Sequence, residues 1–264
     1  MKTKTENSFL KRYIIAIYFV ITFLITIILG AAYMFTNNAF ISPQYAPTIG
    51  LVLICGMLNN WSAWVKMNWN SVKTKKILLW MLVSLFLPVA VILISSLIIS
   101  SMGNQFVIWK DTSLGYVITI ITAMLGCITE EIGWRGYLLP MFAKKHNMFY
   151  STIVVGSLWG IWHCKFTYGL SGFFLFVMLI ICFSIFMAWV YMKTSGNLLC
   201  MILFHFGVNV GSVTLLQSRE GVLFYALATT ICVIICIPIV LKNKNEFFNK
   251  KIEKEMPTIK MNII

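Results

Sequence analysis

The stretch LGYVITIITAMLGCITEEIGWRGYLLP, residues 114–140, is the part of the chain that decides the fold class. Residues 114–128 carry no charge, and Glu130, Glu131 and Arg135 then follow within six positions. A run of this kind predicts a membrane helix, since about 20 apolar residues cross a hydrocarbon core of ~30 Å. An ionisable residue in such a helix costs roughly 2.5–3.5 kcal/mol, so the three charges need a specific reason.

The composition extends this interpretation to the whole chain. Its 264 residues are 59% hydrophobic and 11% charged, against about 25% charged in soluble domains. No segment rich in Pro, Gly or Ser divides the chain, which favours a single domain. The seven cysteines are an odd number scattered through apolar runs, so they predict neither a disulfide framework nor a zinc ribbon.

The distribution of apolar runs predicts an all-α, polytopic membrane protein with about eight transmembrane helices. The first is expected to be retained, because its apolar core exceeds the 7–15 residues of a signal peptide. Residues 1–12 are predicted to be a cytoplasmic segment, 13–241 the transmembrane domain and 242–264 a basic cytoplasmic tail. The eight predicted spans are 13–35, 47–66, 77–102, 114–134, 150–167, 170–192, 197–217 and 222–241.

Charge asymmetry predicts the orientation of these spans. With the N-terminus inside, 18 of the 21 basic residues fall in inner segments, and only Lys110, Lys165 and Arg219 fall outside. The positive-inside rule then indicates eight spans with both termini cytoplasmic, as expected of an integral plasma-membrane protein. The net charge of +13 thus follows topology and does not indicate nucleic acid. The lysine-rich tail is expected to contact anionic lipid headgroups.

The spacing of the polar residues within the spans predicts that their side chains lie close together. Glu131 and Arg135 are four residues apart, which suits a helical ion pair, and Glu130 points about 100° away from Glu131. His205 and Asn209 also share one helix face, and Trp159 lies one turn before His163. At 1.5 Å per residue, these groups are predicted to meet in the cytoplasmic half of the membrane. A purely structural role of the Glu131–Arg135 pair remains open.

Such a pocket has a limited chemistry. Two imidazoles, a carboxylate and an amide can hold zinc or a water molecule. A carboxylate beside water can act as a general base, and an amide or imidazole can stabilise an oxyanion. The combination predicts peptide hydrolysis. The sequence contains neither HExxH nor GxSxG, so the common helical zinc-protease and serine-hydrolase motifs are excluded.

Three motifs carry a resemblance to a known family. EEIGWRG (130–136), WGIWH (159–163) and HFGVN (205–209) resemble the EExxxR, FxxxH and HxxxN/D motifs of the CPBP family of CaaX-protease-like and bacteriocin-processing membrane proteins. The resemblance covers about residues 110–215. It implies endoproteolysis in which Glu130 activates water, with His163, His205 and Asn209 completing the site and Glu131 and Arg135 supporting it. Trp159 stands where Phe is usual, and we expect it to keep an aromatic wall.

The resemblance leaves the cofactor and the biological role open. Glu130, His163, His205 and Asn209 are candidate ligands of Zn²⁺, and a metal-independent mechanism through glutamate and histidine is the other possibility. The expected substrate is a membrane-associated protein or peptide, with a role in bacteriocin self-immunity or peptide maturation. The alternative is a non-enzymatic scaffold or transporter whose pocket binds a cation or solute. Transport would favour symmetric repeats, and the sequence shows none.

Overall fold

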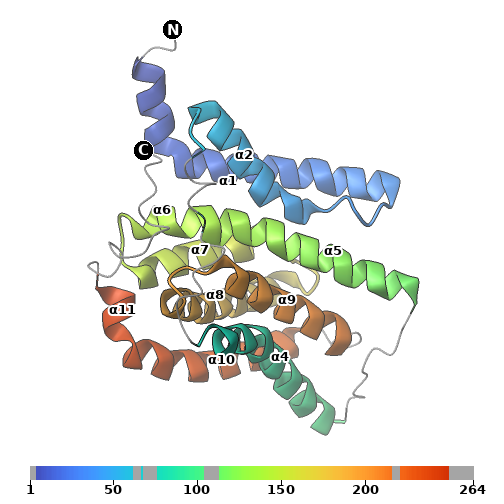
Figure 1. Cartoon of the computed structure of the whole chain (residues 1–264). Helices are drawn as coiled ribbons and strands as arrows, with labels where there is room; N and C mark the ends of the chain where they lie inside the picture. The colour runs from blue at the N-terminus through green and yellow to red at the C-terminus, as the bar shows by residue number, and fades with distance from the viewer. Residues whose placement is uncertain (1–3, 62–66, 68–75, 104–112, 216–220, 250–264) are drawn as a thin grey trace.

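A computed structural model describes residues 4–61, 67, 76–103, 113–215 and 221–249, which contain helices and no strand. The helical elements are drawn in Figure 1. They are α1 (Lys4–Thr36), η1 (Pro43–Tyr45), α2 (Ala46–Leu58), α4 (Ile77–Ser101), α5 (Leu114–Glu131), η2 (Ile132–Leu138), α6 (Leu139–Ala143), α7 (Met148–Trp162), α8 (Gly169–Lys193), α9 (Leu198–Leu215), α10 (Val222–Lys242) and α11 (Lys244–Phe248). The predicted all-α class is confirmed.

Six of the eight predicted spans are helices long and apolar enough to cross a membrane, which makes the chain an integral membrane protein. The other two are shorter, Pro43–Leu58 and Met148–Trp162. At 1.5 Å per residue they reach roughly 24 and 22 Å, short of a hydrocarbon core of ~30 Å. Eight crossings therefore stay a prediction. The second predicted span also runs into residues 62–66, which lie outside the described residues.

Local backbone geometry explains where the two short helices end. Asn59 takes a left-handed conformation with a φ of 47° and caps α2. Cys164, just after α7, has the same φ. Non-glycine residues adopt this conformation uncommonly, and asparagine does so most readily because its short polar side chain bonds locally. His163 is therefore the last residue before the chain leaves the direction of α7.

The helix that carries the two glutamates is longer than predicted. α5 continues through the π-helix η2 into α6, giving a 30-residue rod from Leu114 to Ala143 instead of a span ending at 134. Arg135 was expected in an inner segment, and it is buried, with 2% of its surface exposed. Because Arg135 forms an ion pair with Glu131, its charge is neutralised and the helix can continue past it. Glu130 consequently lies near the middle of the rod.

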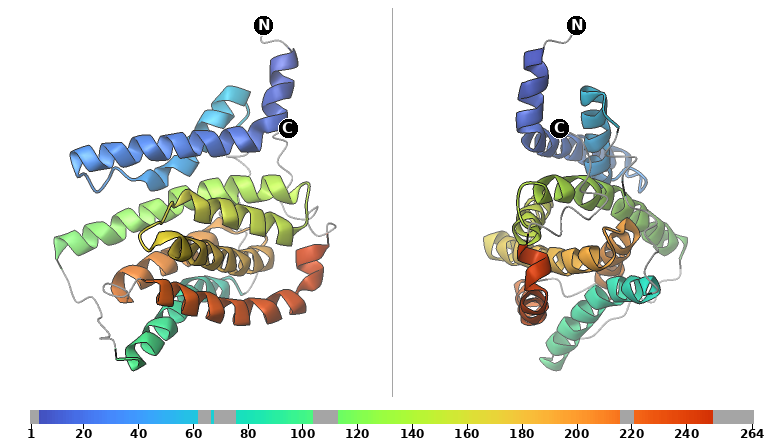
Figure 2. Two further views of the ribbon diagram at one scale, coloured as in Figure 1. Left: turned by 180° about the vertical axis from the view of Figure 1, so that it is seen from behind. Right: turned by 60° about the vertical axis from the view of Figure 1, so that its left-hand side comes forward.

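The connection between α1 and α2 turns back against α5. α1 packs against η1 and α2, which in turn contact α5, and this layer lies above α5 in Figures 1 and 2. Beyond Thr36 the chain reverses, so that η1 and the start of α2 reach the second half of α5. The hydroxyl of Thr129 lies 3.0 Å from the carbonyl oxygen of Gln44, and the hydroxyl of Tyr18 donates to that of Pro47 at 3.0 Å. The start of α2 is thereby fixed beside Glu130.

The remaining helices hold α9 in place. α9 packs against α4, α5 and α8, and α7 packs against α8. At Gly207 the backbone of α4 approaches so closely that a Cβ would overlap the carbonyl oxygen of Leu85. Small residues at helix crossings are typical of membrane bundles. This close crossing fixes the rotation of α9, which carries His205 two residues earlier.

The first part of the predicted basic tail contacts the bundle. α11 lies within residues 242–264, and Phe247 is fully buried with its ring 6.2 Å from that of Phe149. Lys193 forms an ion pair with Glu246. The tail therefore begins as a short packed helix. Residues 250–264 lie outside the described residues, so the predicted lipid contact remains a prediction.

Candidate active site

Four elements supply the predicted site residues. α5 carries Glu130 and Glu131, and η2 carries Arg135. α7 carries Trp159 and ends directly before His163, and α9 carries His205 and Asn209. The two glutamates are fully buried, and Arg135 and His205 are each 2% exposed. Buried charges need partners, and each of these groups has one.

Glu131 is bound to a cation and to an imidazole. Its Oε1 accepts a hydrogen bond from Nη1 of Arg135 at 2.9 Å, so the predicted ion pair forms. Nδ1 of His205 lies 2.9 Å from the same oxygen. Nη2 of Arg135 donates to the hydroxyl of Ser184 on α8 at 3.0 Å. Glu131 thus joins α5, η2 and α9 and fixes the orientation of the His205 ring.

Glu130 has different partners. Its Oε1 accepts from Nε2 of Gln44 at 2.9 Å, and its Oε2 accepts from Nε1 of Trp159 at 2.7 Å. Both donors are neutral. They hold the carboxylate in a fixed plane without neutralising its charge, whereas Glu131 has Arg135 beside it. The prediction that one carboxylate is neutralised locally while the other has a different partner is confirmed.

Trp159 has a larger role than the aromatic wall that the sequence predicted. Its ring packs beneath Arg135, whose Cζ lies 4.1 Å from the ring centroid. The ring also meets His163 and His205 edge-on, at centroid distances of 5.7 and 5.0 Å. The indole N–H contacts Glu130 directly, which a phenylalanine could not do. The Trp-for-Phe difference therefore adds a hydrogen bond to the candidate base.

Both histidines contact their partners in the described part of the chain through Nδ1. Nδ1 of His163 lies 2.8 Å from the carbonyl oxygen of Trp159, and Nδ1 of His205 is bound to Glu131. Among the described residues neither ring forms a hydrogen bond through Nε2, which leaves this atom for a substrate, a water molecule or a metal. His163 is half-buried, which makes it the most accessible of the charged or ionisable groups in the site.

Asn209 lies against the same helix as Glu130. Its Nδ2 donates to Sγ of Cys127 at 3.2 Å, three residues before Glu130 on α5. His205 and Asn209 therefore both face α5, as their spacing predicted. The structure brings all seven predicted residues to one region where α5, η2, α7 and α9 meet.

A zinc site formed by Glu130, His163, His205 and Asn209 needs these side chains to converge on one point. Within the part of the chain that the structure describes, no three His, Cys, Asp or Glu side chains are close enough together to hold a metal ion. Glu130 is turned to Gln44 and Trp159, and His205 to Glu131. The described arrangement does not fit a preformed metal centre. Zinc binding remains a prediction.

Sequence reasoning missed two residues of the network, Gln44 and Ser184. Gln44 lies in a polar stretch between two apolar runs, 86 residues before Glu130, and belongs to no motif. Ser184 is a single polar residue within the apolar run ICFSIF, residues 181–186. Neither residue can be recognised from the local sequence, because each acts through a contact between segments that are far apart in the chain.

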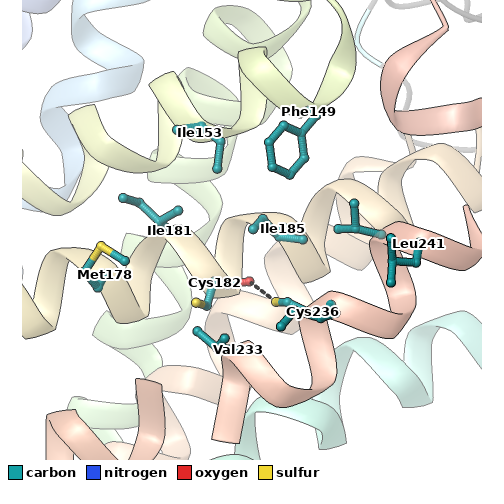
Figure 3. A pocket seen from close by; sticks show the side chains of 11 residues that line it. Phe149, Ile153, Met178, Ile181, Cys182, Ile185, Val233, Cys236 and Leu241 are labelled. Atoms are coloured by element: carbon teal, nitrogen blue, oxygen red, sulfur yellow. Dashed lines mark hydrogen bonds between the residues drawn. The ribbon is translucent and has the colours of Figure 1, made fainter. Parts of the chain in front are cut away.

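A separate cavity of about 330 Å³ lies between α7, α8 and α10 and is shown in Figure 3. Phe149 and Ile153 line one side, and Cys182 and Cys236 meet at the other, where Sγ of Cys236 lies 3.6 Å from the carbonyl oxygen of Cys182. Its lining has no charged residue and no histidine. It is therefore distinct from the polar site and lacks the groups needed for hydrolysis.

Comparison with known proteins shows that the region containing the site matches a family model. Residues 112–211 match the family model described as type II CAAX prenyl endopeptidase Rce1-like. The match includes all seven predicted site residues and Ser184, and it excludes Gln44.

Named relatives agree with this match. The chain is 26% identical over 189 residues to CAAX prenyl protease 2 of Methanococcus maripaludis, which covers 64% of this chain and 67% of that protein. It is 30% identical over 166 residues to lysostaphin resistance protein A of Staphylococcus haemolyticus, covering 59% of this chain and 45% of that protein. The Staphylococcus aureus (strain Newman) protein of the same name is 26% identical over 147 residues. The chain thus spans about two thirds of the first relative and less than half of the second.

Proposed function

The chain belongs to the CPBP family of CAAX-protease-like membrane endopeptidases, and we propose that it hydrolyses a peptide bond through a water molecule activated by Glu130. The observation that carries this proposal is the pair of neutral donors on Glu130, Gln44 and Trp159. A carboxylate held by neutral donors keeps its capacity to take a proton. Glu131 has Arg135 beside it and is the weaker candidate.

The proposed reaction uses the chain's own side chains. Glu130 accepts a proton from water while the water oxygen forms a bond to the carbonyl carbon of the scissile peptide. Nε2 of His163 or His205 and the amide of Asn209 stabilise the negative charge that develops on the carbonyl oxygen. When the carbon–nitrogen bond breaks, Glu130 returns its proton to the leaving amine. Glu131 keeps the ring of His205 oriented throughout, as a partner behind the reacting groups.

Zinc binding at this site is a proposal that depends on the charge of the buried cluster. The buried cluster contains two carboxylates and one guanidinium, so one further positive charge, on a proton or on a metal ion, would balance it. The Nε2 atoms of His163 and His205 are the groups that would bind zinc first. We favour the route through glutamate and histidine, since Glu130 is held by two protein donors.

We propose that the substrate is a membrane-associated protein or peptide, because the site lies within a bundle of membrane-spanning helices. The name of the Methanococcus relative suggests C-terminal CAAX sequences as one candidate class. The names of the staphylococcal relatives suggest a role in resistance, which is in line with bacteriocin self-immunity. The predicted plasma-membrane location and cytoplasmic termini rest on the charge asymmetry of the sequence.

The proposal is tested in cells by comparing the protein termini of membranes that contain the wild-type chain or its Glu130→Ala variant. We expect at least one terminus that depends on Glu130. An internally quenched fluorescent peptide that spans this cleavage site then serves as the reporter peptide for purified protein. Identical sets of termini at equal expression would refute the proposed function and favour a binding scaffold.

A further inference from the structure

Gln44 lies far outside the three sequence motifs, and its side chain reaches the carboxylate of Glu130. The amide Nε2 donates to Oε1 of Glu130 at 2.9 Å. Residue 44 is outside the matched range 112–211 and belongs to the segment that folds back between α1 and α2. We propose that Gln44 is a positioning residue that holds Glu130 in its reactive orientation, an inference that rests on the proposed function.

The side chain of Gln44 is itself held in place. Its backbone N–H donates to the hydroxyl of Ser42 at 3.3 Å, and that hydroxyl lies 3.4 Å from its Oε1. The short helix η1 begins at this cap, with Pro43 in its first position. Proline is favoured there because its ring presets φ. Gln44 therefore presents its amide from a rigid turn, with its oxygen facing Ser42 and its nitrogen facing Glu130.

A second set of contacts fixes this turn to the helix that carries Glu130. The hydroxyl of Thr129 lies 3.0 Å from the carbonyl oxygen of Gln44, and it shares its one proton with the carbonyl oxygens of Leu125 and Gly126 in its own helix. The hydroxyl of Thr48 donates to the carbonyl oxygen of Thr129. The hydroxyl and the carbonyl of Thr129 thus both contact the segment 44–48. Since Thr129 directly precedes Glu130, the clamp sets the distance between the Gln44 amide and the carboxylate.

Gly126 provides the space that the amide needs. A Cβ at this position would lie 2.2 Å from Oε1 of Gln44, 2.5 Å from its amide carbon and 3.0 Å from its Nε2. Any larger residue at 126 would therefore displace the end of this side chain. Glycine within a helix is destabilising relative to alanine, so its presence here needs a reason. The approach of Gln44 to Glu130 supplies that reason.

The chemistry of the amide suits a general base. A lysine or arginine at residue 44 would form an ion pair with Glu130 and make it a poorer proton acceptor. The amide binds one oxygen through a single N–H and carries no charge. With Trp159 on the other oxygen, the two donors fix the carboxylate plane and leave a lone pair on each oxygen for water. Such fixed donors avoid a reorganisation cost during the reaction.

The inference is tested with Gln44→Ala, Gly126→Ala and the double variant, using the reporter peptide. Each single substitution should lower kcat about 10- to 100-fold with KM within about twofold, the scale seen when a supporting partner is lost. The double variant should be no slower than Gln44→Ala alone, since the methyl group then has no amide to displace. Gly115→Ala is the control, because this exposed glycine of α5 has only ordinary contacts.

Stability separates this role from a structural one. Gly126→Ala should melt within a few degrees of the wild-type temperature, because the gain from alanine in the helix offsets part of the hydrogen bond lost from Glu130. A folded yet slower enzyme is the result expected. Wild-type kcat in Gln44→Ala or Gly126→Ala, or multiplicative effects in the double variant, would overturn the inference. If Gln44→Ala does not fold, Gln44→Met and Gly126→Ala decide it by the same criterion.

The two proposals fail in different ways. If Glu130→Gln is inactive and the Gln44 and Gly126 variants are fully active, the inference fails and the proposed function stands. If Glu130→Gln cleaves the reporter peptide at the wild-type rate, the proposed function fails and the positioning role fails with it.

Discussion

Glu131→Gln should destabilise the protein strongly, although it changes the side chain by only one atom. Oε1 of Glu131 binds both Arg135 and His205, and a glutamine oxygen could accept the same two hydrogen bonds. The charge, however, is lost. Arg135 is 2% exposed and would remain as a buried cation without its ion-pair partner. Removing one member of a buried pair costs about 3–5 kcal/mol.

This free energy converts to a measurable shift. At roughly 2 °C per kcal/mol for a chain of this length, melting of Glu131→Gln in detergent should fall by about 6–10 °C. The double variant Glu131→Gln/Arg135→Met removes both charges and should regain most of that loss. Its cleavage of the reporter peptide should nevertheless stay about 10- to 100-fold below wild type, because His205 no longer has an ionised partner.

The test measures the melting temperature and the rate of reporter-peptide cleavage for the single and double variants in the same detergent. A wild-type melting temperature for Glu131→Gln would show that the pair does not stabilise the fold. A double variant less stable than Glu131→Gln would show that Arg135 acts through Trp159 and Ser184 and not through Glu131.

Three further predictions concern the other partners, the metal and the topology. Trp159→Phe keeps the ring beside Arg135 and removes the hydrogen bond to Glu130, so kcat should fall at least about tenfold, as expected for a hydrogen bond to a charged group; unchanged kcat would assign Trp159 to packing alone. If His163 and His205 bind zinc, purified protein should contain about one zinc ion per chain and His205→Ala should lose it, whereas full activity without metal would refute a zinc mechanism. With the exposed Cys164 replaced, a cysteine at Asn38 should react with an impermeant maleimide from outside and one at Lys145 should not; the inverse pattern would reverse the orientation.

The sequence predicted the helical class and the proximity of the candidate site residues because both depend on local patterns. Apolar runs define membrane helices through their length. The spacing of Glu131 and Arg135 gives an ion pair that the structure confirms. His205 and Asn209 face the same helix because they are four residues apart. Each of these inferences depends only on the sequence of a single helix.

The partners of these residues could not be predicted in the same way. Pairing of His205 with Glu131, and of Glu130 with Gln44, depends on how α9 and the 37–45 segment meet α5. The end of the predicted span at 134 was also wrong, because a neutralised Arg135 continues the helix. Hydropathy treats Arg135 as a charge that ends a span and contains no information about its partner.

The measurement that tests the account most directly is the cleavage rate of purified Glu130→Gln with the reporter peptide, with its melting temperature as the control. The substitution keeps shape and can still accept the hydrogen bond from Trp159 or Gln44, but it cannot take a proton from water. We expect folding and melting close to wild type and a rate lowered at least about 100-fold. A variant that cleaves at the wild-type rate would contradict the assignment of Glu130 as the base, and with it the proposed function.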